Sequence, residues 1–185
     1  MRGARFLSIV AIGCGTALAA PSSDSLYNLR PALTDQRGQA TTLEAAARGP
    51  ALVSMFYASC QHVCPMLVSS AKSIDSALAP AERARLRVLF VSFDPERDTP
   101  AALAAVAQRH AVDQARWTFA RAPAGEVRAL AASLGIQYRR LADGEFNHST
   151  IITLLDRQGR IVAHTEHLGA PEPEFVAAVR QALVK

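Results

Sequence analysis

The feature that most constrains the fold is an apolar run, residues 51–57, that leads directly into a cysteine pair and a second apolar segment. The run Ala-Leu-Val-Ser-Met-Phe-Tyr has the length and apolar content of a buried central strand. After Cys60 and Cys64, apolar residues return at helical spacing and predict a helix over residues 65–78. The sequence therefore predicts a strand and a helix with two thiols at their junction.

The rest of the chain alternates apolar runs with helical patterns. Further strands are predicted at 86–93, 117–120, 151–155 and 161–165, and further helices at 100–110, 125–134 and 173–184. Near the N-terminus, residues 27–29 and 40–42 are expected to pair as a hairpin across residues 35–38. This order predicts a single α/β domain of thioredoxin-like layout, with a central mixed sheet flanked by helices and an N-terminal hairpin extension.

The first 19 residues have the pattern of a signal peptide. Arg2 and Arg5 form a short positive region, residues 6–18 are mostly apolar, and the small residues at 17–19 offer a cleavage site. This apolar stretch is shorter than the roughly 20 residues of a transmembrane helix. An uncleaved N-terminal anchor and lipidation at Cys14 stay open as alternatives. The prediction is an exported, periplasmic domain of residues 20–185, with membrane attachment through the N-terminus as the open variant.

The charge of the chain argues against one class of partner. The formal net charge is +4, and removal of Arg2 and Arg5 with the signal segment lowers it to about +2. No basic run and no interleaving of basic with aromatic residues is present in the sequence. Nucleic-acid binding is therefore not expected.

The cysteine pair allows two kinds of chemistry. On the first turn of a helix, positions i and i+4 share a face, so the thiols of Cys60 and Cys64 could form a disulfide or hold one thiophilic ion. Helix N-terminal amides stabilise a thiolate, which is both the redox nucleophile and the soft-metal ligand. Signal cleavage would leave these as the two cysteines of the mature chain, and the ring they close is too short to stabilise the fold much. A functional pair is expected.

A third ligand would favour the metal, and the chain has five histidines. His148 is the best candidate, because the loop that holds it, residues 143–150, leads into the strand predicted at 151–155. The others fit less well: one lies between the cysteines and points away from their shared face, one ends a helix, and two fall on opposite faces of a strand. These are His62, His110, His164 and His167.

Three segments together resemble the Sco/SenC family of copper-binding proteins. They are the Cys60…Cys64-Pro65 motif, the segment Val-Ser-Phe-Asp-Pro-Glu-Arg-Asp-Thr-Pro at 91–100, and His148-Ser149. The resemblance implies a thioredoxin-like fold and a copper site made of Cys60, Cys64 and His148. It also implies delivery of copper to, or thiol reduction in, the binuclear copper centre of cytochrome c oxidase. Asp94 is either a residue near this site or a turn residue before Pro95.

The chain departs from the family pattern at a few positions. Gln61 and His62 stand between the cysteines where the family usually has an acidic residue, and Asn147 stands where it usually has aspartate. Loss of these carboxylates removes negative charge near the metal, and His62 could instead supply a ligand. The expected client is therefore open: the copper-centre subunit of cytochrome c oxidase, or another copper or thiol client.

Two functions remain in competition. One is a periplasmic copper metallochaperone that uses all three ligands, and the other is a thiol–disulfide oxidoreductase in which Cys60 and Cys64 are the redox-active residues without a resident metal. The presence of His148 favours the first, because a dithiol enzyme has no need of it. A peroxiredoxin-like peroxidase is disfavoured, because Tyr57 occupies the position of the usual threonine three residues before the cysteine.

Overall fold

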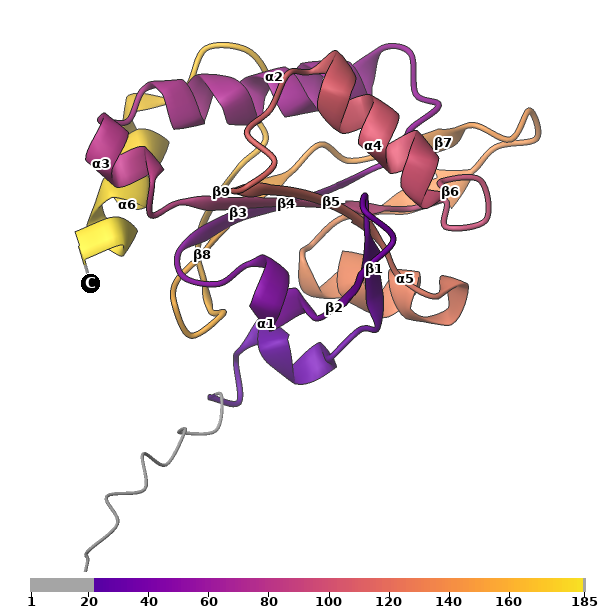
Figure 1. Ribbon diagram of the computed structural model, residues 1–185, viewed down its shortest axis with the longest axis horizontal. Helices are drawn as coiled ribbons and strands as arrows, with labels where there is room; N and C mark the ends of the chain where they lie inside the picture. Colours follow the sequence, from indigo (N-terminus) through magenta and orange to yellow (C-terminus); the bar gives the residue numbers. More distant parts are fainter. Residues whose placement is uncertain (1–21, 185) are drawn as a thin grey trace, which may run out of the picture.

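A seven-stranded mixed sheet forms the centre of the computed structural model, which describes residues 22–184. The predicted signal segment, residues 1–19, lies outside the described residues. The strand order is β2-β1-β5-β4-β3-β8-β9 (Figure 1). The strands are β1 (Leu33–Asp35), β2 (Ala40–Thr41), β3 (Ala51–Phe56), β4 (Arg87–Ser92), β5 (Trp117–Arg121), β8 (Ile152–Leu155) and β9 (Ile161–Thr165). Neighbours among β3, β4 and β5 run parallel, and the remaining pairs are antiparallel.

Helices cover both faces of this sheet. Figure 1 shows α2 (Val63–Ser76) and α4 (Pro100–Arg109) over one face, and α1 (Leu43–Ala46) and α5 (Ala124–Ser133) over the other. The short α3 (Pro80–Arg83) and the closing α6 (Pro173–Val184) lie together, where Arg180 pairs with Glu82 at 3.6 Å. None of the helices in residues 22–184 combines the length and apolar character needed to cross a bilayer.

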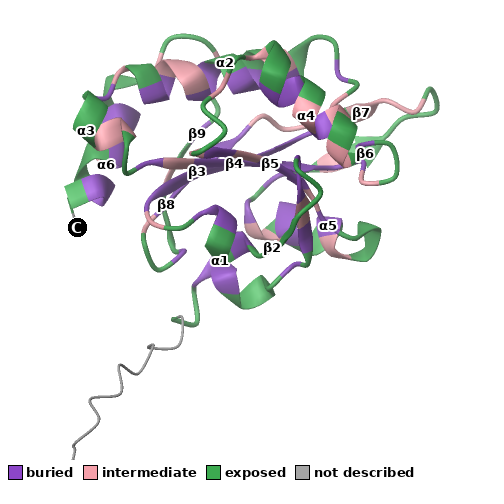
Figure 2. Ribbon diagram, in the orientation of Figure 1, coloured by how far each residue is buried: buried purple, intermediate pink, exposed green. Residues whose placement is uncertain are grey.

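The core lies on both sides of the central strands. Every residue of β3 is buried, and in β4 all but the first are buried (Figure 2). Aromatic rings fill the space beside them: Phe56 meets Phe90 and Phe119 edge-on at 5.8 and 5.4 Å, and Phe90 stacks on Trp117. Each such side chain contributes about 1.5–3 kcal/mol by leaving water. The predicted α/β class, with a mixed sheet flanked by helices, is confirmed.

Local signals explain where the main helices begin. Thr99 caps α4 by accepting a hydrogen bond from the N–H of Ala102, and Pro100 occupies the first helical position. Helix α2 begins at Val63, two residues before the predicted start, so that Pro65 falls within its first turn. Proline is tolerated there because the first turn needs no N–H donor.

The predicted N-terminal hairpin exists, but its first strand is Leu33–Asp35 rather than residues 27–29. Strands β1 and β2 form the hairpin, and β1 extends the sheet by pairing with β5. Residues 27–29, predicted as a strand, belong instead to a 3₁₀ turn, Leu26–Leu29. Tertiary contacts decide this: the Tyr27 hydroxyl donates to the carbonyl of Ala47, and the N–H of Leu26 donates to the carbonyl of Gly159.

A second, separate hairpin was not predicted. Strands β6 (Tyr138–Arg140) and β7 (Phe146–His148) form a two-stranded sheet of their own. In Figure 1 it lies at the end of the molecule where α2 begins. His148, expected in a loop, is the last residue of β7. The hairpin therefore brings a histidine to the end of the sheet that holds the cysteines.

Candidate metal centre

The two cysteines lie on either side of the start of α2. Cys60 is in the loop between β3 and α2, and its sulfur accepts a hydrogen bond from the N–H of Cys64 at 3.3 Å. Cys64 is the second residue of the helix. The pair thus does not share a helical face. Instead, the thiol of Cys60 folds over the positive N-terminal end of the helix, which favours a thiolate there.

A buried aspartate fixes the loop that carries Cys60. Asp98 accepts hydrogen bonds from the N–H of Ala58 at 2.9 Å and from the hydroxyl of Ser92 at 2.5 Å. Burial raises the pKa of Asp98 above its ordinary value. Asp98 is not predictable as a site residue from the sequence, although it belongs to the acidic segment after β4. Spacing along the chain gives no sign that it reaches back to the cysteine loop.

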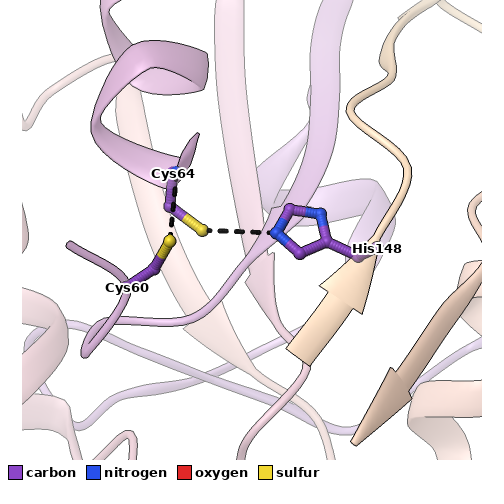
Figure 3. A group of neighbouring side chains, drawn as sticks. All are labelled: Cys60, Cys64 and His148. Atoms are coloured by element: carbon purple, nitrogen blue, oxygen red, sulfur yellow. Dashed lines mark hydrogen bonds between the residues drawn. The ribbon is translucent and has the colours of Figure 1, made fainter. Parts of the chain in front are cut away.

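His148 faces the cysteines from β7. Its Nε2 lies 3.7 Å from the sulfur of Cys64 (Figure 3). Its Nδ1 lies 3.0 Å from the carbonyl oxygen of Ser149. Because a carbonyl only accepts, Nδ1 carries the proton in this contact and Nε2 presents a lone pair to the sulfur. The imidazole packs against the ring of Phe93, with centroids 5.0 Å apart, and meets the ring of Tyr57 edge-on at 5.9 Å. Packing and hydrogen bonding together set its orientation.

Cys60, Cys64 and His148 form a group that could hold a metal ion. Their ligand atoms all lie within 4.8 Å of one another, with both cysteines buried and the histidine partly buried. Bonds of about 2.0–2.3 Å to a first-row metal such as zinc require ligand atoms no more than about 4.6 Å apart. The three donors therefore fit one small, thiophilic ion with little adjustment.

The other histidines do not join this group. His62 is exposed at the start of α2 and caps the helix with no side-chain hydrogen bond. His110 ends α4 as predicted, but burial, Lys72 and Arg109 lower its pKa, which disfavours the cationic form expected at a helix end. His164 lies in β9 and His167 just beyond it, outside the group around the cysteines.

Asp94 has the turn role rather than a place in the metal group. Its N–H donates to the hydroxyl of Ser92, and its carboxylate pairs with Arg97. Arg97 in turn donates to the carbonyl of Gly144, in the loop of the β6–β7 hairpin, at 2.5 Å. Asp94 therefore holds an arginine that contacts the hairpin carrying His148.

The two thiols differ in acidity. Burial alone would raise the pKa of Cys60, but hydrogen bonds from the N–H groups of Cys64 and His62 outweigh it and leave the pKa lowered, with help from the Cys64 and Tyr57 side chains. Burial raises the pKa of Cys64 well above that of an ordinary thiol, and the neighbouring Cys60 adds to the rise. Cys60 is therefore the more acidic thiol of the pair, and Cys64 keeps its proton near neutral pH.

This difference predicts an order of alkylation in the reduced, metal-free protein. Cys60 should react with iodoacetamide before Cys64, because the thiolate is the nucleophile and Cys60 holds more of it. Timed quenching followed by mass spectrometry of the peptides measures both rates. Faster labelling of Cys64 would contradict the assignment of the thiolate to Cys60.

Comparisons with solved structures support the fold. The chain is similar to Bradyrhizobium japonicum ScoI, whose structure has copper bound, with 26% identity and a TM-score of 0.69 over 83% of this chain and 97% of that one. It is also similar to a SCO1/SenC family lipoprotein from Bacillus anthracis, with 19% identity and a TM-score of 0.75 over 91% and 100% of the two chains.

A further likeness is to BsSco, described as a member of the Sco family of cytochrome c oxidase assembly proteins with a disulfide switch. It is 21% identical, with a TM-score of 0.69 over 87% of this chain and 96% of that one. A comparison with curated protein sequences finds no match. The family model described as SCO1/SenC matches residues 21–184, nearly the whole chain. The chain belongs to the SCO1/SenC family.

Proposed function

We propose that this chain is an exported copper metallochaperone that assists assembly of the copper centre of cytochrome c oxidase. Copper is held by Cys60, Cys64 and His148. The observation that carries the proposal is the convergence of two thiols and one imidazole within 4.8 Å at a buried site. Residues 1–19 serve as a signal peptide or N-terminal anchor, which places the domain in the periplasm, either soluble or attached to the membrane.

The donor set favours copper over harder ions. Thiolates are soft ligands that select Cu(I), and an imidazole suits copper in either oxidation state. The likeness to ScoI with copper bound supports the same choice. Copper bound by such ligands can be transferred to the soft ligands of a client protein.

Each residue of this chain has a distinct part in binding. Cys60 offers a sulfur that is already inclined to the thiolate, and Cys64 must release a proton when it binds. The hydrogen bond from Nδ1 of His148 to the Ser149 carbonyl favours the tautomer in which Nε2 is the donor atom for the metal. Apolar and aromatic neighbours exclude water from the two sulfurs. The client is the copper-centre subunit of the oxidase, in keeping with the description of BsSco.

The difference between the two thiols favours one alternative, a thiol–disulfide oxidoreductase. The Cys60 thiolate would attack a client disulfide, forming a mixed disulfide and releasing one client thiolate. Cys64 would then pass its proton to the released client thiolate, and its sulfur would attack Cys60, closing the Cys60–Cys64 disulfide and releasing the second client sulfur as a thiolate. The client gains two electrons and this chain loses two. Neither step requires His148.

A two-armed transfer assay separates these functions. In one arm, reduced protein carrying Cu(I) is mixed with the metal-free, reduced copper-centre domain of the oxidase, and copper is measured in each protein after separation. In the other arm, metal-free reduced protein meets the disulfide form of that domain, and the client thiols are counted by alkylation. Both arms are repeated with His148→Ala.

We expect copper to move to the client from the wild-type protein and His148→Ala to deliver far less. The proposal fails if no copper moves while thiol reduction proceeds equally well with both proteins. That outcome would establish the oxidoreductase instead.

A further inference from the structure

The hairpin that carries His148 is attached to the rest of the molecule by few polar contacts. It forms a sheet of its own rather than joining the central one. Among the described residues, two hydrogen bonds reach its loop from the body of the protein. Arg97 donates to the carbonyl of Gly144, and the hydroxyl of Tyr57 donates to a carboxylate oxygen of Glu145 at 2.8 Å. The position of His148 depends on such contacts.

Tyr57 is placed to act on the histidine directly and through the hairpin. It follows β3, three residues before Cys60, and only 4% of it is exposed. Its ring contacts Phe146 at 5.2 Å and meets the imidazole of His148 edge-on at 5.9 Å. One side chain therefore joins the cysteine loop to β7, near both its first residue and its last.

The Tyr57 hydroxyl adds a directed hydrogen bond that ring packing alone does not provide. Ring packing against Phe146 and His148 is tolerant of small sliding motions, whereas a hydrogen bond to a carboxylate has a short, directed geometry. Glu145 directly precedes β7, so fixing its carboxylate limits movement of the strand that ends at His148. A phenylalanine at position 57 would keep the ring and lose this constraint.

We propose that Tyr57 is a positioning residue for the metal site, acting through its hydrogen bond to Glu145. This bond holds the β6–β7 hairpin so that Nε2 of His148 stays beside the cysteine pair. The inference rests on the proposed role of His148 as a copper ligand and goes beyond it, because neither Tyr57 nor Glu145 belongs to the ligand group.

Tyr57→Phe tests this with the smallest change. Loss of a group that orients a ligand commonly lowers metal affinity by about 10–100-fold, and we expect a decrease in that range for Cu(II), measured by competition with a chelator. The thiolate-to-Cu(II) absorption band should shift, because the geometry at the imidazole changes. In the metal-free protein, amide hydrogen exchange in residues 146–148 should become faster.

Tyr138→Phe is the matched control. Tyr138 lies in the same hairpin and stacks on Phe93 with ring centroids 4.9 Å apart. Its hydroxyl forms no hydrogen bond with any residue in the range 22–184. All three readouts should stay at the wild-type level. Glu145→Gln should also stay close to wild type, because the amide oxygen still accepts from Tyr57. Glu145→Ala removes the hydrogen bond to the hairpin but keeps the Tyr57 hydroxyl, which also hydrogen-bonds to Cys60, so it isolates the link to the hairpin. It should show faster exchange in residues 146–148 and a lower Cu(II) affinity than the wild type.

The outcomes separate the inference from the proposed function. If wild-type protein binds copper and Tyr57→Phe changes neither affinity, nor spectrum, nor exchange, the inference is wrong and the function stands. If wild-type protein fails to bind copper, the function is wrong. The exchange measurement on metal-free protein then still decides whether Tyr57 holds the hairpin. Faster amide exchange in residues 146–148 in Tyr57→Phe, but not in Tyr138→Phe, supports the link to Glu145. The same exchange rate in Tyr57→Phe and Tyr138→Phe overturns it.

Discussion

Replacement of His148 by alanine is expected to weaken Cu(II) binding more than about 100-fold, beyond the range typical for losing a residue that only orients a ligand. The imidazole is the nitrogen donor of the three-residue group, and its Nε2 already lies 3.7 Å from the sulfur of Cys64. Without it, the two sulfurs retain a preference for Cu(I). Titration of reduced protein with Cu(II) against a competing chelator gives the affinity, and the thiolate-to-Cu(II) absorption band reports the ligand set.

His62→Ala is the matched control for this experiment. That imidazole lies between the cysteines in sequence, but it is exposed and outside the ligand group. Its removal should leave the Cu(II) affinity within a few-fold of wild type. A larger loss in His62→Ala than in His148→Ala would mean that His62 supplies the nitrogen, and equal losses would mean that the ligand group of three residues is incomplete.

Asp75→Ala is expected to lower the free energy of unfolding by about 3 kcal/mol, near the lower end for breaking a buried ion pair. The carboxylate of Asp75 is 4% exposed and bonds to two arginines: Arg116 at 2.9 Å and Arg83 at 3.2 Å. It raises the pKa of Arg116, whose side chain is only 12% exposed. Removal of the carboxylate leaves that charge partly buried with poorer compensation. Urea denaturation followed by circular dichroism measures the loss.

Asp113→Ala removes the other carboxylate that contacts Arg116. Asp113 bonds to the same guanidinium at 2.9 Å, but its side chain is 51% exposed. An exposed pair contributes at most about 1 kcal/mol. Equal losses in the free energy of unfolding for Asp75→Ala and Asp113→Ala would contradict this explanation, because burial of the carboxylate would then have no effect on stability. Neither residue touches the metal group, so copper affinity should survive both changes.

The framework of the fold could be predicted because its elements are long and strongly patterned. The strand predicted at residues 51–57 agrees with β3, Ala51–Phe56, to within one residue. The helix cap and the proline at 99–100 correctly indicate the start of α4. Burial on both faces demands continuous apolar strands, and this demand is visible in one sequence. The convergence of Cys60, Cys64 and His148 was implied by family resemblance, and the structure brings these three residues together.

What could not be predicted depends on contacts between distant residues. The strands β6 and β7 are short and mostly exposed or partly buried, so neither has an apolar pattern. Asp98 accepts a hydrogen bond from Ala58 in the cysteine loop, 40 residues away in sequence, and Glu145 accepts one from Tyr57, 88 residues away. Local propensity carries no information about such pairs. The 3₁₀ turn at Leu26–Leu29 escaped prediction for the same reason, because Gly159 and Ala47 hold it in place.

X-ray absorption spectroscopy of the copper-loaded, reduced protein tests the central claim most directly. With one Cu(I) bound per chain, the account predicts two sulfur donors and one nitrogen donor, and it predicts that His148→Ala removes the nitrogen while both sulfurs remain. A copper ion coordinated only by nitrogen and oxygen, or a nitrogen contribution unchanged in His148→Ala, would contradict the assignment of Cys60, Cys64 and His148 as the metal site.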